Sequence, residues 1–171
     1  VAFRGPDPNG WPVPDEWIAR MGELPLRNQP GSSWRYHLGS DVLGVWLQRI
    51  GDAPLEDVLI ERVLGPLGMH DTRFWVRPES IDRFGACTLV DEEAGSVVVH
   101  DDVLGDWSAP PSFPSAGAGL VSTVADYSAF ADMHLRGGPA SDGGGDRIVA
   151  EELIEEMARD QLAGRAVAGA D

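Results

Sequence analysis

Residues 40–64, SDVLGVWLQRIGDAPLEDVLIERVL, carry the strongest fold signal in the sequence. Apolar residues recur there at the three- and four-residue spacing of a helix, in two runs separated by a glycine and a proline. Glycine commonly follows the end of a helix, and proline commonly opens one. The stretch therefore predicts two consecutive helices, Asp41–Ile50 and Pro54–Leu64, with Ser40 as the N-cap of the first. Because almost the whole surface of the first helix is apolar, we expect it to be buried.

Helices are also predicted on both sides of this stretch, together with a few short strands. The helices are Pro14–Leu24, Thr123–Leu135 and Ala150–Leu162, the last with Leu153, Ile154 and Met157 inward. Thr123 and Asp126 have the spacing of a capping box with Asp in place of Glu. Runs of β-branched and aromatic residues predict strands at Arg73–Val76, Ala86–Val90 and Ser96–His100, the last two joined as a hairpin. This is an α+β, mainly α inventory without a central sheet, so the chain is either a small bundle or one lobe of a larger fold.

Charge and hydrophobicity exclude several classes of function. Acidic residues outnumber basic ones by 28 to 13, and the formal net charge is −15. Nucleic acids and anionic lipids are bound mainly through clustered lysine and arginine, so we exclude both as partners. No window approaches the roughly 20 apolar residues of a membrane-spanning helix. The 171 residues fit one globular domain, and all 13 basic residues are arginine.

The side chains that commonly bind metals are too scattered to predict a site. Cys87 is the only cysteine, so neither an intramolecular disulfide nor a cysteine-based zinc site can form. We expect Cys87 to be a small buried apolar residue. Of the four histidines, His37, His70, His100 and His134, only His100 precedes two consecutive carboxylates, those of Asp101 and Asp102. We interpret that cluster as a solvated turn, and we predict neither a metal nor a cofactor.

Two common catalytic motifs are absent from the sequence. No serine has glycine at both flanking positions of a G-x-S-x-G motif, which excludes the nucleophile elbow of α/β hydrolases. The P-loop requires a lysine, and the chain contains none. Nucleotide binding through that loop is therefore excluded.

The order of several landmarks identifies a family. PLGMHDT, residues 66–72, follows the two central helices, and GLVSTVADY, residues 119–127, follows the hairpin and a proline-rich loop. With residues 24–76 and 115–138 around them, these motifs resemble the serine β-lactamase-like hydrolases. The branch they resemble most is related to class C β-lactamases and includes serine esterases and D-alanyl-D-alanine carboxypeptidases. The resemblance implies the helical lobe of that fold with a small β-hairpin, its central antiparallel sheet largely missing.

The resemblance also suggests a task for Tyr36. The family keeps a Tyr-x-Asn motif on a loop at the rim of the active site, and Tyr36-His37-Leu38 occupies the matching place. Tyr36 would then correspond to the tyrosine that handles the proton of the nucleophile. A phenol beside a lysine ammonium can have its pKa lowered from the usual value of about 10, which suits it to that role. Without the family context, Tyr36 would be interpreted as a loop aromatic. We assign three other aromatic residues, Trp34, Trp46 and Phe74, to packing. We expect the glycines of SAGAGL to permit positive φ angles and a close approach of the backbone.

Two departures from the family pattern limit what the resemblance implies. Leu38 stands where β-lactamases have asparagine, so we expect an esterase-like protein more than a true β-lactamase. A chain without lysine can hold neither the S-x-x-K nucleophile motif nor a Lys-Thr-Gly strand. We therefore interpret residues 1–171 as a single partial domain, the central helical region of the hydrolase with both flanks absent, and we expect large apolar side chains to be exposed.

Two functions stay open at this point. In the first, the chain is part of a serine hydrolase that acts by acyl transfer on a small ester, lactam, amide or D-amino-acid peptide. In the second, it is a non-catalytic, acidic helical interaction module derived from the same fold. An S-x-x-K motif upstream in the same coding sequence would favour the enzyme.

Overall fold

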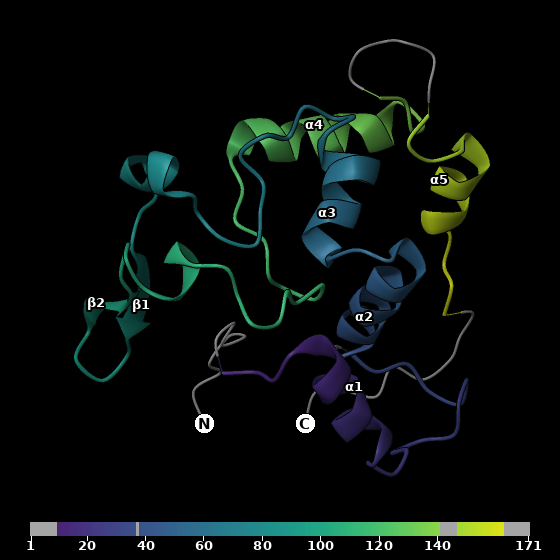
Figure 1. Cartoon of the computed structure of the whole chain (residues 1–171), viewed down its shortest axis with the longest axis horizontal. Coiled ribbons are helices and arrows are strands. Elements are labelled where there is room, and N and C mark those ends of the chain that lie inside the picture. Colours follow the sequence, from purple (N-terminus) through teal and green to yellow (C-terminus); the bar gives the residue numbers. More distant parts are fainter. Residues whose placement is uncertain (1–9, 37, 141–146, 163–171) are drawn as a thin grey trace.

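The computed structural model describes residues 10–36, 38–140 and 147–162, and helices form most of their regular structure (Figure 1). In chain order the elements are α1 (Pro14–Gly22), α2 (Gly39–Gly51), α3 (Leu55–Leu59), the π-helical turn η1 (Ile60–Leu64), the 3₁₀ helix η2 (Pro78–Arg83), strands β1 (Cys87–Asp91) and β2 (Ser96–Asp101), the 3₁₀ turn η3 (Asp106–Ser108), α4 (Val124–Leu135) and α5 (Glu151–Met157). Within these residues the only sheet is the antiparallel pair β1–β2. The predicted α+β, mainly helical class is confirmed.

The two central helices form where they were predicted, with different ends. Helix α2 begins at Gly39 after Leu38, and no side chain caps it, so the prediction of Ser40 as the N-cap is wrong. Pro54 is the N-cap of α3. Helix α3 continues into η1, where the Gly65 amide donates to the Ile60 carbonyl over 2.8 Å. A Cβ at Gly65 would lie 2.7 Å from that carbonyl oxygen, so the π-helical closure requires glycine.

The hairpin is confirmed to within one residue at each end, but the third predicted strand is not. Strands β1 and β2 pair Leu89 with Val98, and the hairpin projects away from the helices in Figure 1. At Arg73–Val76 the chain forms one isolated bridge, Arg73 with Val121, and the Val76 amide bonds the Trp107 carbonyl over 2.8 Å. Phe74 and Val76 of this segment are buried in the core. No second strand runs beside the segment among the described residues, so the pairing does not extend beyond the bridge.

The outer helices are shorter than predicted. Helix α1 ends at Gly22 instead of Leu24, and α5 covers Glu151–Met157 instead of Ala150–Leu162. Leu153 and Met157 are exposed, so their predicted inward position is wrong, while Ile154 packs against the core. Helix α4 begins as predicted, because the Thr123 hydroxyl accepts the Asp126 amide over 3.2 Å.

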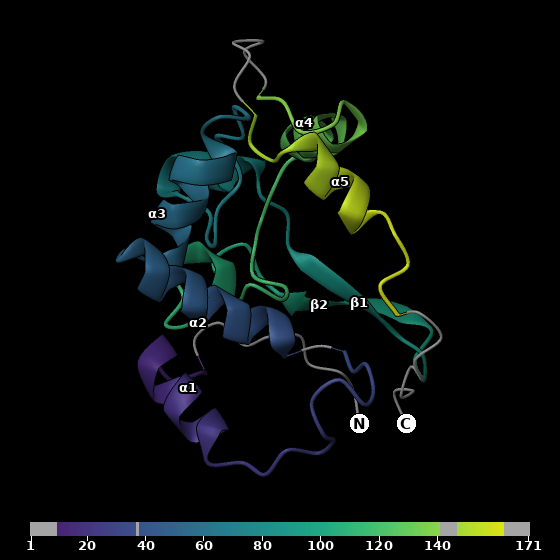
Figure 2. The ribbon, with the colours of Figure 1, turned by 90° about the vertical axis from the view of Figure 1, so that its right-hand side faces the viewer.

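Two small apolar cores hold the helices together. One core joins η1 to α4 through Leu64, Leu67, Met69 and Met133. The other joins α1 to α2 and to the loop before α4 through Trp17, Val45 and Phe113. Figure 2 shows the resulting arrangement, with α2 between α1 on one side and α3 and α4 on the other.

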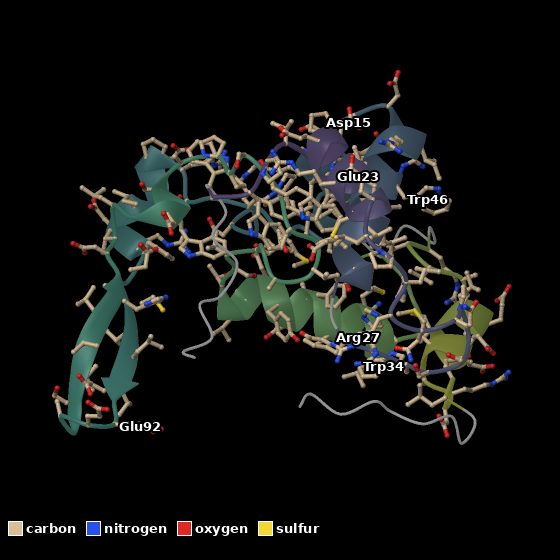
Figure 3. All side chains as sticks on the ribbon, turned by 90° about the horizontal axis from the view of Figure 1, so that it is seen from below. Asp15, Glu23, Arg27, Trp34, Trp46 and Glu92 are labelled. Carbon is tan, nitrogen blue, oxygen red and sulfur yellow. The ribbon has the colours of Figure 1, made fainter. Side chains whose placement is uncertain are left out.

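The outer face of α2 is exposed, which corrects the prediction that this helix is buried. Asp41, Gly44 and Val45 face inward, whereas Val42, Leu43, Trp46 and Ile50 are exposed. Trp46 is 57% exposed and lies at the periphery in Figure 3, so its assignment to packing is wrong. Phe74, by contrast, is buried as predicted. The expectation that large apolar side chains would be exposed is therefore confirmed. Among the described residues, the neighbours of α2 lie only on its inner face.

We expect Gly44→Ala to lower the free energy of unfolding of the full-length protein by about 1–3 kcal/mol, the usual cost of overpacking. A Cβ at Gly44 would lie 2.7 Å from Ala116 Cβ and 3.2 Å from Leu55 Cδ2. Urea unfolding measures this change, with Gly22→Ala as the control because a Cβ there meets nothing within 4 Å. Equal unfolding midpoints for the two variants would contradict the close packing of α2 on residue 116.

Candidate functional site

Tyr36 lies on the loop that leads into α2, where the sequence placed it. Its side chain is 76% exposed, and its ring centroid is 6.3 Å from that of Trp34, with the ring planes at 38°. Trp34 is itself exposed. The phenol is therefore accessible from outside the helices. The catalytic role of Tyr36 stays a prediction, and His37 lies outside the described residues.

Local polar contacts shape the loop that carries Tyr36. Gly31 adopts a φ of +78°, which favours glycine, and forms the predicted Pro-Gly turn. The Ser32 hydroxyl donates to the Gln29 carbonyl over 2.8 Å, and Arg35 Nε donates to Asn28 Oδ1 over 2.6 Å. Both bonds lie within the loop, which also forms an isolated backbone bridge at Trp34, two residues before Tyr36.

The two family landmarks meet at Asp126, on the first turn of α4. Asp126 is 8% exposed, and its Oδ2 accepts the Asp71 amide over 2.9 Å and the Thr72 hydroxyl over 2.8 Å. The Ser122 hydroxyl lies 2.8 Å from that of Thr72. The Arg73–Val121 bridge continues the contact. Residues 66–72 and 119–127 are thus one hydrogen-bonded unit.

An ion pair borders this unit at the surface. The Arg83 guanidinium donates to the Asp71 carboxylate, with a nitrogen–oxygen distance of 2.8 Å. This hydrogen bond, reinforced by the positive charge, lowers the pKa of Asp71 below its usual value. Because both side chains are partly exposed, solvent screens the pair and its contribution to stability is small.

A second buried carboxylate, Asp41, joins α2 to the SAGAGL loop. Asp41 is 0% exposed. Its Oδ1 accepts the Ser115 hydroxyl over 2.7 Å and the Gly117 amide over 3.2 Å. A Cβ at Gly119 would lie 2.5 Å from the Ser115 carbonyl oxygen, so the predicted close backbone approach is confirmed. Neither Gly117 nor Gly119 has a positive φ, so that part of the prediction is wrong.

An apolar groove of about 530 Å³ lies between α2, α3 and the 115–120 loop. Its lining carries no charged side chain and consists of Ser40, Leu43, Leu47, Leu55, Leu59 and Phe74 together with residues 115–120. Ser40 lies four residues after Tyr36, so one end of the groove is at the start of α2. The lining and volume suit an aliphatic or aromatic group of a small molecule.

The other predicted features can be placed in the described residues as well. No group of three or more His, Cys, Asp or Glu side chains there could hold a metal ion. Asp101 and Asp102 accept backbone amides of Asp106 and Val103 at the turn after β2, but Asp101 Oδ2 is buried, so the interpretation as a solvated turn is wrong for Asp101. Cys87 is exposed at the start of β1, so its predicted burial is wrong. Among the described helices, none is long and apolar enough to cross a bilayer.

Sequence reasoning missed Asp41 and Ser115 as members of the site and treated Asp126 as a cap alone. One signal was available, because an aspartate in the first turn of an almost wholly apolar helix needs a polar partner if that turn is buried. The identity of the partner, 74 residues further along the chain, was not available from the sequence pattern.

Comparison with known proteins gives a consistent result. A family model described as Beta-lactamase matches residues 2–171. Protein Rv1367c of Mycobacterium tuberculosis is 41% identical over 150 residues, which cover 87% of this chain and 36% of that protein. Esterase EstB of Burkholderia gladioli is 33% identical over 127 residues, covering 66% of this chain and 32% of that protein. The chain spans about a third of the length of these relatives.

Solved structures show the same fold. Unliganded simvastatin synthase LovD of Aspergillus terreus aligns with a TM-score of 0.69 at 25% identity, covering 83% of this chain and 33% of that one. An octameric penicillin-binding protein homologue from Pyrococcus abyssi aligns with a TM-score of 0.64 at 23% identity, covering 91% of this chain and 31% of that one. The described helices and hairpin are therefore arranged as in part of each of these larger structures.

Proposed function

The chain belongs to the serine β-lactamase-like family, and from this we propose that the full-length protein is a serine hydrolase in which Tyr36 handles the proton of the nucleophile. The observation that carries the proposal is the exposed phenol of Tyr36 on the loop entering α2, at the place of the tyrosine in the family motif. The chain contains no lysine, so the serine and lysine of an S-x-x-K motif would come from residues outside it.

We propose a small ester as the preferred substrate, ahead of an amide, a β-lactam or a D-amino-acid peptide. Leu38 replaces the asparagine amide of the β-lactamase pattern, and the apolar groove beside Ser40 presents a surface without charge. An ester with an apolar acyl group suits both features, because neither supplies a charged or amide partner to a polar substrate. The similarity to a protein named as an esterase supports the same choice.

In the proposed reaction, the serine hydroxyl attacks the ester carbonyl carbon while its proton passes to the phenolate oxygen of Tyr36. The tetrahedral intermediate collapses, the carbon–oxygen bond to the alcohol breaks, and Tyr36 returns the proton to the departing alkoxide. Water then attacks the acyl-enzyme, losing its proton to Tyr36. When the acyl bond breaks, that proton passes to the serine oxygen, and the carboxylic acid and the free serine are released.

Covalent labelling tests this proposal. A serine-directed alkyl phosphonate should modify the full-length protein once per molecule, as measured by intact mass. The isolated 171-residue chain should stay unlabelled, because its serines lack a lysine to activate them.

Two outcomes of this experiment would contradict the proposal. Stoichiometric labelling of the isolated chain would place the nucleophile among residues 1–171. A full-length protein that takes up no phosphonate and hydrolyses no p-nitrophenyl ester would instead favour the non-catalytic interaction module.

A further inference from the structure

Asp41 is a buried carboxylate that no cation balances among the described residues. Asp41 is fully buried in the first turn of α2, five residues after Tyr36. None of the ion pairs found among the described residues includes Asp41. Its Oδ2 is buried, and no described residue bonds it. Buried acidic side chains are almost always paired, so this arrangement carries a cost in stability that a neutral side chain would avoid.

Both hydrogen bonds of Asp41 hold the same distant loop. Its Oδ1 accepts from the Ser115 hydroxyl and the Gly117 amide, so one oxygen atom joins α2 to residues 115–117. The packing around this junction leaves little room for movement. A Cβ at Gly117 would lie 3.3 Å from Asp41 Oδ2, and one at Gly44 would lie 2.7 Å from Ala116 Cβ. The first turn of α2 is therefore fixed against the loop by hydrogen bonds and by close contact.

This junction fixes the first turn of α2, whose own N-terminal amides have no side-chain cap. The N-cap residue Leu38 has no side-chain oxygen, and no side-chain cap bond forms at that end. The loop before it is held by two internal hydrogen bonds and by an isolated backbone bridge at Trp34. The Asp41 junction lies five residues after Tyr36, so it helps to set the position of the helix start and the direction in which Tyr36 leaves the helix.

We propose that Asp41 is a positioning residue, which holds the start of α2 against Ser115 and Gly117 and so fixes Tyr36 in its reactive orientation. The inference rests on the proposed function of Tyr36. Loss of the junction would leave the fold largely intact but let the helix start shift against the loop. Misplacement of an acid–base group by about 1 Å can cost on the order of 10²-fold in rate.

The test compares variants of the full-length protein on p-nitrophenyl butyrate, with kcat expressed per active site titrated by the phosphonate. Asp41→Ala should lower kcat per site by about 10–100-fold with KM changed less than about twofold, because Tyr36 acts on the chemical step. Asp41→Asn should recover activity to within about threefold of wild type, since its amide oxygen can still accept from Ser115 and Gly117. Asp132→Ala, at an exposed aspartate of α4, is the matched control and should leave kcat unchanged.

Titration separates positioning from folding, because a merely structural role would reduce the number of titrated sites and leave kcat per site unchanged. That result for Asp41→Ala would overturn the inference while leaving the proposed function intact.

If Asp41→Ala yields no folded protein, the Ser115→Ala variant provides the test, since it removes one hydrogen bond and retains the carboxylate. An unchanged kcat per site in Ser115→Ala would then be the contradicting result, and a fall of about 3–10-fold the supporting one. A wild-type protein that neither titrates nor turns over would contradict the proposed function itself.

Discussion

Tyr36→Phe is expected to lower kcat/KM of the full-length protein for a short-chain p-nitrophenyl ester by about 10²–10⁴-fold, the usual range for a positioned acid–base group. The substitution removes a hydroxyl from a side chain that is 76% exposed, so the fold should lose little stability. Steady-state kinetics and the melting temperature, measured on the same preparation, check both parts of this expectation.

The chain supplies a matched control for this experiment. It contains two tyrosines, and Tyr127 on α4 is also exposed. Tyr127→Phe removes the same atom at a similar exposure and should leave kcat/KM unchanged. Near-normal turnover in Tyr36→Phe, or equal losses in the two variants, would make Tyr36 a loop aromatic and remove it from the site.

Asp126→Ala is expected to lower the free energy of unfolding of the full-length protein by about 2–4 kcal/mol, because hydrogen bonds to a charged group contribute about 1.5–3 kcal/mol each. The substitution removes the acceptor of the Asp71 amide and of the buried Thr72 hydroxyl. Urea unfolding followed by far-UV circular dichroism measures the change.

Two further variants show whether this loss comes from the contact between the landmarks. Asp126→Asn keeps an acceptor oxygen and should lose less than half as much stability, and the exposed Asp132→Ala on the same helix should be nearly neutral. A double-mutant cycle of Asp126→Ala with Thr72→Val should give a coupling energy above about 0.5 kcal/mol. Additive effects, or a loss below about 1 kcal/mol in Asp126→Ala, would mean that the two motifs are not held together by this carboxylate.

Local signals predicted most of the elements of this fold. The hairpin is marked by β-branched residues around a turn, and the cap of α4 by Thr123, because both structures depend on residues close together in the chain. Helix ends were less predictable. Helix α2 starts before Ser40, and its first turn is joined to a loop 74 residues further along the chain through Asp41, which a local capping signal does not reveal.

Features that depend on distant contacts could not be predicted in this way. The sequence pattern of α2 indicates how apolar its surface is. Burial of that surface depends on which neighbours pack against it, and Trp46 is exposed among the described residues. The segment Arg73–Val76 has strand composition, yet its only bridge is to Val121, 48 residues after Arg73. The proposed role of Tyr36 came from a family motif, whereas the bonds of Asp41 and Asp126 required the folded chain.

The rate of acylation in a single turnover reports on the role of Tyr36 without contributions from later steps. Full-length wild-type protein and Tyr36→Phe would be mixed in excess with p-nitrophenyl butyrate, and the release of p-nitrophenol would be followed together with the mass of the acyl-enzyme. We predict that both proteins acquire one butyryl group on the same serine, and that Tyr36→Phe does so about 10²–10⁴-fold more slowly. Equal acylation rates in the two proteins would contradict the assignment of Tyr36 as the residue that takes the proton of the nucleophile.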